Sequence, residues 1–433
     1  MSLLVEKGER PFTAVRRPST VAVLALLVIA AGAALNVALS PDGPLVLSDA
    51  RIYRAAAELW WRDGDLYREH LYGGGNPAFF TYPPFALLPI AVVFYDFTFG
   101  AAVLMVGGVA ALFHICSLVI ERLRPSLPHR YLVAAAATLC ATHLEPVTST
   151  LFWGQINIFL LWLVAVDCLS RSARWPRGLA VGVAAAIKLT PLCFVLFFLL
   201  GKQIRPTVTA FVSFAVCGGV GFLVAPAISV DFWTRAVFDP DRVGNVLLPA
   251  NESLRGVLAR LDLAPATWMV ASAAVVALTA FVVFRYRAQD HDVPAWLAVA
   301  AMGTLVSPMS WSHHWVWLIA LLVAATVWAI TDARPYPRLV PAGLVSIAMI
   351  FAPHLHLAAT SWWHPLAESY VWIGLALLIV LAAADVRRRC LRGARSRPVE
   401  SQRFSMSNVP GFPGRARLGD SGTPSHSGHS AQQ

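Results

Sequence analysis

The sequence predicts an all-α, polytopic membrane protein. Of its 433 residues, 57% are hydrophobic and only 13% are charged, whereas an ordinary soluble domain contains about 25% charged residues. Long apolar runs recur along nearly the whole chain, and no stretch shows the alternating pattern of a half-buried strand. These observations favour a single membrane domain, residues 20–391, with short connections and no separate soluble catalytic domain.

Basic residues beside the apolar runs at both ends of the chain predict its orientation. Residues 1–19 form a basic tail that includes RPFTAVRR, and the first span, residues 20–40, is too long for a cleaved signal peptide. The run DVRRRCLRGARSR follows the last apolar run. The positive-inside rule therefore predicts that both termini are cytoplasmic. Residues 392–433, rich in Ser, Gly, Pro and Arg, are expected to form a disordered cytoplasmic tail.

The composition also argues against several classes of protein. The net charge of +10 comes from basic residues beside spans and not from one patch, so we expect no nucleic-acid partner. The six cysteines show no metal-ligand spacing, and five lie in apolar runs, where they are expected to pack. There is no Gly-rich phosphate loop and no repeat of 20 to 50 residues. We therefore expect neither a nucleotide-binding fold nor a metal site.

Further apolar runs predict the remaining spans. They cover residues 79–97, 100–120, 131–143, 151–170, 178–200, 207–228, 265–284, 294–307, 314–331, 338–356 and 367–385. A cytoplasmic C-terminus requires an even number, so we expect about twelve spans, with ten as the alternative. Residues 79–97 open with a double proline and form either a full pass or an interfacial or re-entrant piece. Residues 178–200 contain the break Thr190-Pro191 and form either one span or a hairpin of two short helices.

Residues 48–78 are expected to form the first external loop, and they contain the candidate catalytic residue, Asp49. A helix begins here: its apolar stripe is Ile52, Ala56, Leu59 and Trp60, and its polar face is Arg51, Arg54, Glu58 and Arg62. An Arg-rich amphipathic helix with Trp on its apolar side is typical of the membrane interface. Asp49, the catalytic candidate, then lies at the membrane surface. The alternative is a first-turn carboxylate that favours the helix dipole, after Ser48 as N-cap.

Polar residues within apolar runs need a partner or a function, because an ionised side chain at the centre of a span costs about 2.5 to 3.5 kcal/mol. Lys188 lies beside the proline break, where a water-lined cavity is expected; the alternative is a lysine that extends from a helix end to the interface. Gln155 and Asn157 follow an expected helix start at 144–150. They either line a cavity near the outer interface or form an interhelical hydrogen-bonded pair.

Two further polar segments are expected outside the membrane. In SPMSWSHHWVW, one histidine of the pair His313 and His314 is expected to face a cavity and bind phosphate, since adjacent helical side chains point about 100° apart; the alternative is packing among tryptophans. In NESLRG, Arg255 is a candidate anion clamp after Asn251 and Glu252. The alternative there is the ordinary start of an interfacial helix.

Taken together, these motifs resemble the polyprenol-phosphate-mannose-dependent mannosyltransferases of actinobacteria, glycosyltransferase family 87, which have the GT-C membrane fold. The motifs that carry the resemblance are Asp49-Ala-Arg-Ile-Tyr53, Gly64-Asp65-Leu66-Tyr67, Thr81-Tyr82-Pro83-Pro84, Gly154-Gln155-Ile156-Asn157, Lys188-Leu189-Thr190-Pro191, Asn251-Glu252-Ser253-Leu254-Arg255-Gly256 and Ser307-Pro308-Met309-Ser310-Trp311-Ser312-His313-His314. They span residues 49 to about 315. Glu252 departs from the pattern, which usually has Gln after Asn.

The resemblance implies a GT-C-like bundle that transfers mannose from polyprenyl-phosphate-mannose to a mannosylated glycolipid or lipoglycan, with an α-1,2 linkage and inversion. The active site would face the outside of the cytoplasmic membrane, with no metal or other cofactor. Asp49 would be the catalytic base. The implied donor-phosphate ligands are Lys188, Arg255, His313 and His314, and the implied substrate-binding residues are Tyr53, Tyr82, Gln155, Asn157, Asn251, Glu252 and Ser310.

The residue types fit this chemistry independently. One carboxylate must take the proton of the acceptor hydroxyl, whereas the leaving phosphate needs positive charge more than a proton. Two alternatives stay open: an arabinosyl or other pentosyl transferase with a decaprenyl-phosphate donor, and a secondary transporter or lipid flippase, which would also have many spans and a broken helix.

Overall fold

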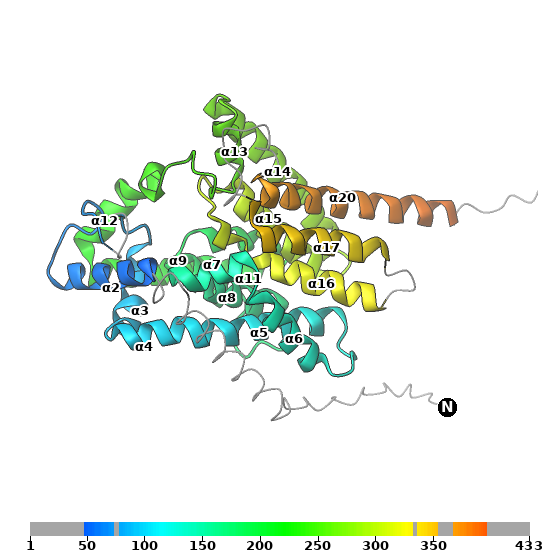
Figure 1. Ribbon diagram of the computed structural model, residues 1–433, viewed down its shortest axis with the longest axis horizontal. Coiled ribbons are helices and arrows are strands. Elements are labelled where there is room, and N and C mark those ends of the chain that lie inside the picture. Colours follow the sequence, from blue (N-terminus) through cyan, green and yellow to red (C-terminus); the bar gives the residue numbers. More distant parts are fainter. Residues whose placement is uncertain (1–46, 73–77, 332–335, 354–366, 396–433) are drawn as a thin grey trace, which may run out of the picture. The chain divides into compact units, whose positions relative to one another are not determined.

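The computed structural model describes residues 47–72, 78–331, 336–353 and 367–395 (Figure 1). In this part of the chain the regular elements are helices. There are also two isolated β-bridges, Leu71 with Ala78 and Asn251 with Trp311. The predicted all-α class is therefore confirmed. The expected first span, residues 20–40, and the tail at 1–19 lie outside the described residues. Residues 392–395 continue the last helix, and the rest of the expected C-terminal tail is also outside the described residues.

The helices follow one another along the chain in this order. The first half contains α2 (Ser48–Trp61), η1 (Pro84–Ala86), α3 (Leu87–Val93), α4 (Phe97–Ala102), η2 (Val103–Gly107), α5 (Gly108–Leu123), α6 (Arg130–Ala141), α7 (Glu145–Trp153), α8 (Asn157–Leu169), α9 (Leu179–Ile187), η3 (Thr190–Phe194), α10 (Val195–Leu200) and α11 (Ile204–Val224). The second half contains α12 (Pro226–Thr234), η4 (Ala236–Phe238), η5 (Pro240–Val243), α13 (Leu254–Arg260), α14 (Pro265–Arg287), α15 (Asp292–Val306), η6 (Ser312–Trp317), α16 (Leu318–Thr331), α17 (Tyr336–Phe351) and α20 (Ser369–Arg395).

Four helices of the described part are long and apolar enough to cross a membrane: Phe97–Leu123, Ile204–Val224, Pro265–Arg287 and Ser312–Ile330. The bent pair α7–α8 makes a fifth if it counts as one span. The described residues therefore do not confirm the expected total of about twelve. They do contain several membrane-length apolar helices, as a multi-pass membrane protein requires.

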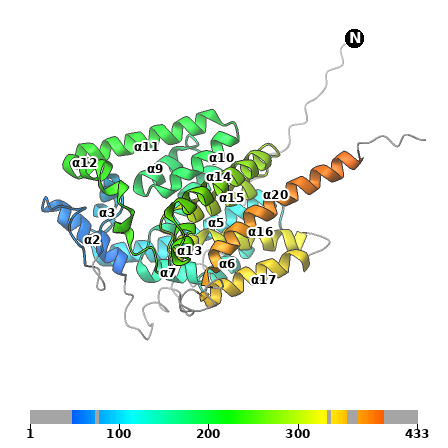
Figure 2. The same ribbon diagram turned by 90° about the horizontal axis from the view of Figure 1, so that it is seen from above.

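Residues 79–97 do not form a full pass. Helix α3 has only seven residues, about 10 Å at 1.5 Å per residue, whereas the hydrocarbon core is about 30 Å thick. It packs against α2 (Figure 2). The chain then turns into α4, which also contacts α2 (Figure 1). The structure therefore favours the interfacial or re-entrant alternative for this segment.

Residues 178–200 form a hairpin and not a single span. Helix α9 ends at Ile187, Lys188 is extended, and η3 and α10 follow. A side chain at Gly178, at one end of the segment, would overlap the carbonyl oxygen of Pro206. Since Pro206 lies only a few residues beyond Leu200, the segment begins and ends in the same region. Of the two predicted alternatives for this segment, the structure therefore has the hairpin of two short helices. Lys188 lies near the tip of the hairpin.

The expected span 151–170 is wrong in its first residues, because the chain bends by 119° between α7 and α8. Gly154 ends α7 in the left-handed region, with φ of 69°, and the apolar span resumes only at Asn157. Leu47 at the start of α2 donates from its backbone N–H to the carbonyl of Phe152 at 3.1 Å. The bend therefore places the start of α2 directly beside Gln155.

Helix α2 has the predicted amphipathic pattern, but the expected cap is wrong. The helix begins at Ser48 itself, its N-cap position is Leu47, and no side chain caps it. Asp49 lies in the first turn as expected. Ile52 and Ala56 of the predicted stripe are buried, and the helix packs against α3, α4 and α7. Because protein covers this stripe, the stripe itself is not evidence that α2 lies in the membrane interface.

The close approach of α2 to the bend makes Gly154 sensitive to substitution. A Cβ at Gly154 would lie 2.7 Å from the Cβ of Ala50 and 3.1 Å from Cδ2 of Leu47. A side chain in the left-handed region adds about 1 to 2 kcal/mol of strain. Gly154→Ala should therefore destabilise the protein by at least that amount and lower the midpoint of thermal unfolding in detergent. The control is Gly219→Ala in α11, where nothing lies within 4 Å; it should be neutral or slightly stabilising. Equal midpoints for the two variants would contradict the proposed packing.

Candidate active site

The side-chain amide of Gln155 links Asp49 to two tyrosines. Its Nε2 donates to Oδ2 of Asp49 at 2.7 Å. Its Oε1 lies 3.2 Å from the hydroxyls of Tyr53 and Tyr82, and the two hydroxyls lie 2.7 Å apart. The two hydroxyls carry two protons: one lies between them and the other is donated to Oε1, so the amide presents its N–H group to the carboxylate. Among the described residues, no hydrogen bond reaches Asp49 Oδ1, so that oxygen can accept from a substrate.

The surroundings of Asp49 make its carboxylate a stronger base. Burial raises the pKa of the Asp49 carboxyl above its ordinary value, while the hydrogen bond from Gln155 and the charge of Lys188 lower it. Burial also raises the pKa values of Tyr53 and Tyr82. Both phenols are therefore neutral donors near pH 7. The net effect is a carboxylate more basic than an exposed aspartate.

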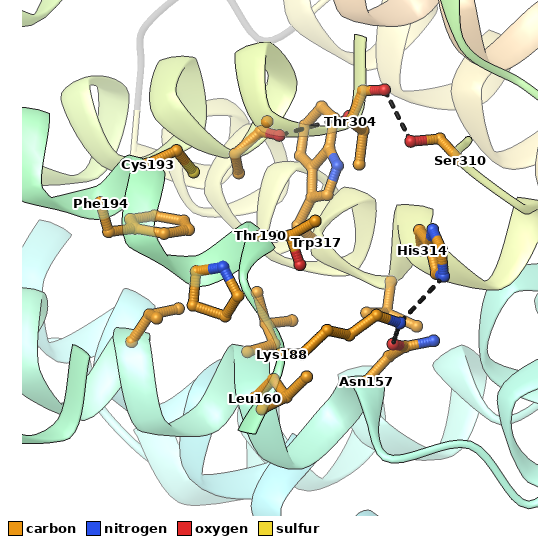
Figure 3. Close-up of a pocket in the computed structure, with 16 residues that line it drawn as sticks. Asn157, Leu160, Lys188, Thr190, Cys193, Phe194, Thr304, Ser310, His314 and Trp317 are labelled. Carbon is orange, nitrogen blue, oxygen red and sulfur yellow. Dashed lines mark hydrogen bonds between the residues drawn. The ribbon is translucent and has the colours of Figure 1, made fainter. Parts of the chain in front are cut away.

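A second polar cluster forms around Lys188, at the tip of the hairpin (Figure 3). Its Nζ donates to Oδ1 of Asn157 at 3.1 Å and lies 3.1 Å from Nε2 of His314. An ammonium group has only donors, so Nε2 of His314 must accept and the imidazole is neutral. Asn157 in turn donates to the carbonyl of His313 at 3.2 Å. Lys188 thus has the partners that an ammonium group inside a membrane protein requires.

These three residues line one end of a cavity of about 90 Å³ between α8, η3, α15 and η6. Figure 3 shows Lys188, Asn157 and His314 together at that end, while Phe194 and Cys193 lie at the other. Thr190, Thr304 and Ser310 add hydroxyl groups to the wall. The cavity therefore offers one positively charged end and one mostly apolar end.

Tyr82 connects the carboxylate and the cation. Its hydroxyl contacts Gln155, which holds Asp49, and Nζ of Lys188 lies 5.4 Å from the centre of its ring. Asp49 and Lys188 consequently approach Tyr82 from different elements, the first loop and the hairpin tip. A proton acceptor and a fixed cation near each other are the two groups that a transfer from a sugar phosphate needs.

Only one of the two histidines faces the cavity, as predicted for adjacent residues of a helix. The two rings are nearly perpendicular, at 86°, and only His314 lines the cavity. The carbonyl of His313 accepts from Thr150 and Asn157. Its ring is buried, and in the described part of the chain Nε2 of His313 has no hydrogen-bond partner.

The structure places Asn251, Glu252 and Arg255 away from the cavity wall. Asn251 accepts from the backbone N–H of Ser310 at 3.0 Å and donates to the carbonyl of Val246 at 3.1 Å. The backbone N–H of Glu252 donates to the carbonyl of Ser310 at 2.8 Å. Arg255 stacks on the ring of Trp268. These contacts give NESLRG a structural role, because Asn251 and Glu252 hold the segment that brings Ser310 to the cavity.

Ser310 is the member of the predicted set that links the NESLRG segment to the cavity. Its hydroxyl donates to the carbonyl of Thr304 at 2.7 Å, and its side chain lines the wall. The carboxyl of Glu252 is fully buried. Burial, followed by the negative charge of Glu368, raises the pKa of Glu252 well above its ordinary value. A raised pKa favours the neutral carboxyl over the carboxylate, as expected for a group that desolvation penalises.

The sequence did not reveal a buried group that supports the histidine turn. Glu145, at the start of α7, accepts from the hydroxyl of Ser312 at 2.6 Å and from that of Tyr370 at 2.9 Å. Nearby, Arg260 is paired with Glu368 through bonds of 2.7 and 2.5 Å. The proximity of these residues depends on the packing of α7, α13 and α20, for which no local sequence pattern exists. The available signal was a lone acidic residue, Glu145, between two expected spans.

Within the described residues, no group of three or more His, Cys, Asp or Glu side chains is placed to hold a metal ion.

Comparisons with known proteins bear on this site. A model of glycosyltransferase family 87 matches residues 80–308. The chain is 33% identical to a polyprenol-phosphate-mannose-dependent alpha-(1-2)-phosphatidylinositol mannoside mannosyltransferase of Mycolicibacterium smegmatis, over 78% of this chain and 84% of the relative. The chain belongs to glycosyltransferase family 87. This assignment confirms the resemblance inferred from the motifs, and it favours an enzyme over a transporter or flippase.

Two further relatives place this family 87 member among similar enzymes. The Mycobacterium tuberculosis protein of the same name is 34% identical, over 82% of this chain and 90% of its own length. A polyprenol-phosphate-mannose-dependent alpha-(1-2)-phosphatidylinositol pentamannoside mannosyltransferase of Mycobacterium tuberculosis is 31% identical, over 84% and 86%. No solved structure matches the chain. The combination of family and apolar helices identifies a multi-pass membrane glycosyltransferase.

The structural role of Asn251 is testable. Asn251→Ala would remove both polar contacts of a fully buried side chain and leave the Ser310 N–H without its acceptor. Such a loss costs about 1 to 3 kcal/mol. We therefore expect a lower midpoint of thermal unfolding. The matched control is Asn245→Ala, an exposed residue whose amide oxygen accepts from the nearby N–H of Leu247 at 2.9 Å. An Asn251→Ala protein as stable as this control, but weaker in substrate binding, would instead indicate a substrate contact.

Proposed function

We propose that this family 87 member transfers mannose from polyprenyl-phosphate-mannose to a mannosylated glycolipid or lipoglycan. The reaction proceeds with inversion and forms an α-1,2 linkage. The observation that carries the proposal is the placement of Asp49 and Lys188 around Tyr82, which puts a proton acceptor and a cation close together. The names of the relatives support the donor and the linkage, and those names specify phosphatidylinositol mannosides as acceptors.

In the proposed reaction, Asp49 is the catalytic base. Oδ1 takes the proton of the acceptor hydroxyl, the hydroxyl oxygen forms the new bond to C1 of mannose, and the bond from C1 to the phosphate oxygen breaks. Polyprenyl phosphate leaves with the electron pair. Gln155 keeps Oδ2 occupied at 2.7 Å, so the carboxylate presents its other oxygen to the acceptor. The raised pKa of Asp49 strengthens it as a base once it is ionised.

The donor phosphate is proposed to bind at the charged end of the cavity. Lys188 donates to two neutral partners there, Asn157 and His314, so its positive charge is not cancelled by a carboxylate in direct contact. An ammonium group in a site of low dielectric stabilises the developing phosphate charge strongly. In this proposal the cation acts in place of a Lewis acid, and no metal or other cofactor is needed. Arg255 and His313 stay weaker candidates for this phosphate, because neither lines the cavity.

The proposal places the active site on the outer face of the membrane. The opposite end of α8, about 20 Å from Asn157 at 1.5 Å per residue, is rich in basic residues. They belong to the ends of α5 and α14, to the α8–α9 and α10–α11 connections and to the start of α11: Arg122, Arg124, Arg171, Arg174, Arg177, Lys202, Arg205, Arg285 and Arg287. Short basic connections are typical of the cytoplasmic side. This pattern supports an outward-facing Asp49, and the basic sequences at the two ends of the chain support cytoplasmic termini.

The proposal also includes a GT-C-like architecture of ten to twelve spans. Ten to twelve spans would require shorter apolar helices, such as α6 and α15, to serve as passes in addition to the long ones. In this arrangement α2 lies near the outer interface. Its exposed Trp61 and the exposed side chains of Val92 and Tyr95, which follow on the α3–α4 corner, support contact with lipid there. Membrane lipids are thus the proposed surroundings of the acceptor.

The donor is tested by incubating the purified protein in nanodiscs with labelled polyprenyl-phosphate-mannose and a phosphatidylinositol mannoside. We expect labelled, α-1,2-linked mannose on the acceptor. The parallel reaction replaces the donor with decaprenyl-phosphate-arabinose and should give no product. Transfer from the arabinose donor alone would overturn the proposed donor and favour the pentosyl alternative, while leaving the family assignment intact.

Asp49→Asn should nearly abolish transfer while leaving the fold and donor binding unchanged. A positioned base contributes about 10² to 10⁴ in rate, and asparagine keeps the size of the side chain. The control variants are Asp63→Asn and Asp65→Asn, both exposed loop residues, which should keep substantial activity. Thermal unfolding and the binding of polyprenyl phosphate are measured beside turnover. Near-normal turnover by a folded Asp49→Asn enzyme would remove Asp49 from the mechanism.

A further inference from the structure

One side chain crosses from the long connection between α11 and α13 to the first external segment. Arg242 in η5 donates to the carbonyl of Tyr67 at 2.6 Å and to that of Phe80 at 3.4 Å. Its guanidinium also lies over the rings of Tyr67 and Phe79, at 5.4 and 4.9 Å. A planar group with several donors is suited to holding two carbonyls between aromatic faces. Arg242 thereby joins the two stretches of chain that precede Tyr82.

Tyr67 transmits this contact toward the active site. Its side chain is 1% exposed, and its hydroxyl donates to the carbonyl of Tyr82 at 2.7 Å. Tyr67 is therefore fixed at both ends, by Arg242 at its own carbonyl and by Tyr82 at its hydroxyl. The ring of Phe232 in α12 packs against it at 5.2 Å. Because Tyr67 is buried and held on all these sides, its hydroxyl sets where the backbone of Tyr82 lies.

Tyr82 completes the connection to the carboxylate. Its hydroxyl lies 2.7 Å from that of Tyr53 and donates to Oε1 of Gln155, whose Nε2 donates to Asp49. The charged and titratable groups that face Asp49 are Tyr53 from its own helix, Tyr82, and Lys188 from the hairpin tip. Displacing Tyr82 would let the Gln155 amide rotate and would weaken its hydrogen bond to the carboxylate. The geometry of Asp49 therefore depends on contacts that begin at Arg242.

We propose that Arg242 is a positioning residue for Asp49, acting through Tyr67, Tyr82 and Gln155. The inference rests on the proposed role of Asp49 as the base. A positioning residue differs from a merely structural one because its loss changes the basicity of Asp49. The Gln155 hydrogen bond lowers the pKa of Asp49, so a weaker bond raises it, and the enzyme must reach a higher pH before the base is ionised.

The test compares the pH dependence of kcat/KM for the wild type and for Arg242→Gln in nanodiscs. Misplacement of a catalytic group by about 1 Å costs up to about 100-fold in rate, so we expect kcat to fall about 10- to 100-fold. The acid limb should move to higher pH, and KM for the donor should change less than kcat, because Asn157 and His314 still hold Lys188. Arg242→Lys, which keeps the charge and a donor, should recover part of the rate.

Two further variants separate positioning from folding. Tyr67→Phe removes only the hydroxyl that holds Tyr82, so it should shift the acid limb in the same direction even if Arg242→Gln folds poorly. Arg235→Gln is the matched control. Arg235 reaches the same Tyr67 carbonyl only at 3.4 Å and is held mainly by Asp231, through bonds of 2.7 and 2.5 Å. This variant should keep the wild-type acid limb and a rate within about threefold of wild type.

The outcomes distinguish this inference from the proposed function. If Asp49→Asn is inactive while Tyr67→Phe keeps both the rate and the acid limb of the wild type, positioning by Arg242 is wrong and the base assignment stands. An equal loss of rate in Arg242→Gln and Arg235→Gln, without a shift of the acid limb in either, also overturns it. If Asp49→Asn itself keeps its turnover, the proposed base is wrong. A shift in both Tyr67→Phe and Arg242→Gln, absent in the control, supports the inference.

Discussion

The hydrogen bond from Gln155 to Asp49 is the contact on which the rest of the site depends. It forms because Gly154 adopts the left-handed conformation that ends α7 and lets α2 approach to within van der Waals contact. Oε1 of the same amide lies 3.2 Å from the hydroxyls of Tyr53 and Tyr82 and accepts the proton that they do not share, so the orientation of the amide is fixed. One side chain at a helix bend thus decides both which oxygen of the carboxylate is free and how basic the carboxylate is. The substrate-binding role expected for Gln155 becomes an orienting role in this arrangement.

A second constraint is the cost of placing charge in an apolar surrounding. Lys188 offsets part of that cost through two neutral partners, Asn157 and His314, and not through an ion pair. A carboxylate in direct contact would bind the ammonium group more tightly but would also cancel the charge that a phosphate requires. The hairpin of α9 and α10 makes this possible because it brings Lys188 to its tip and lets the chain return to the region where it started. The hairpin and the proposed phosphate site at its tip therefore have the same physical cause, the break in the helix before Pro191.

The sequence predicted features that depend on local pattern. The helical class, the stripe on α2 and the break near Lys188 follow from periodicity and from proline chemistry. The separation of His313 from His314 follows from the large angle between adjacent side chains of a helix, about 120° in a 3₁₀ helix such as η6. Contacts between distant segments were not predictable in this way. Nothing local shows that Asn251 holds the backbone of Ser310, or that Arg242 donates to backbone carbonyls of the first external segment. Such carbonyls have no sequence signature, since every residue carries one.

The central claim is that Asp49 and Lys188 act on opposite sides of the same glycosidic bond. The most direct measurement is a structure of the protein with a non-transferable phosphonate analogue of polyprenyl-phosphate-mannose and a phosphatidylinositol mannoside acceptor. The account predicts that the attacking hydroxyl lies within hydrogen-bond distance of Asp49 Oδ1, and that the phosphonate contacts Lys188 Nζ at the charged end of the cavity. A bound donor whose phosphonate lies away from Lys188, or an acceptor hydroxyl that faces another carboxylate, would contradict it.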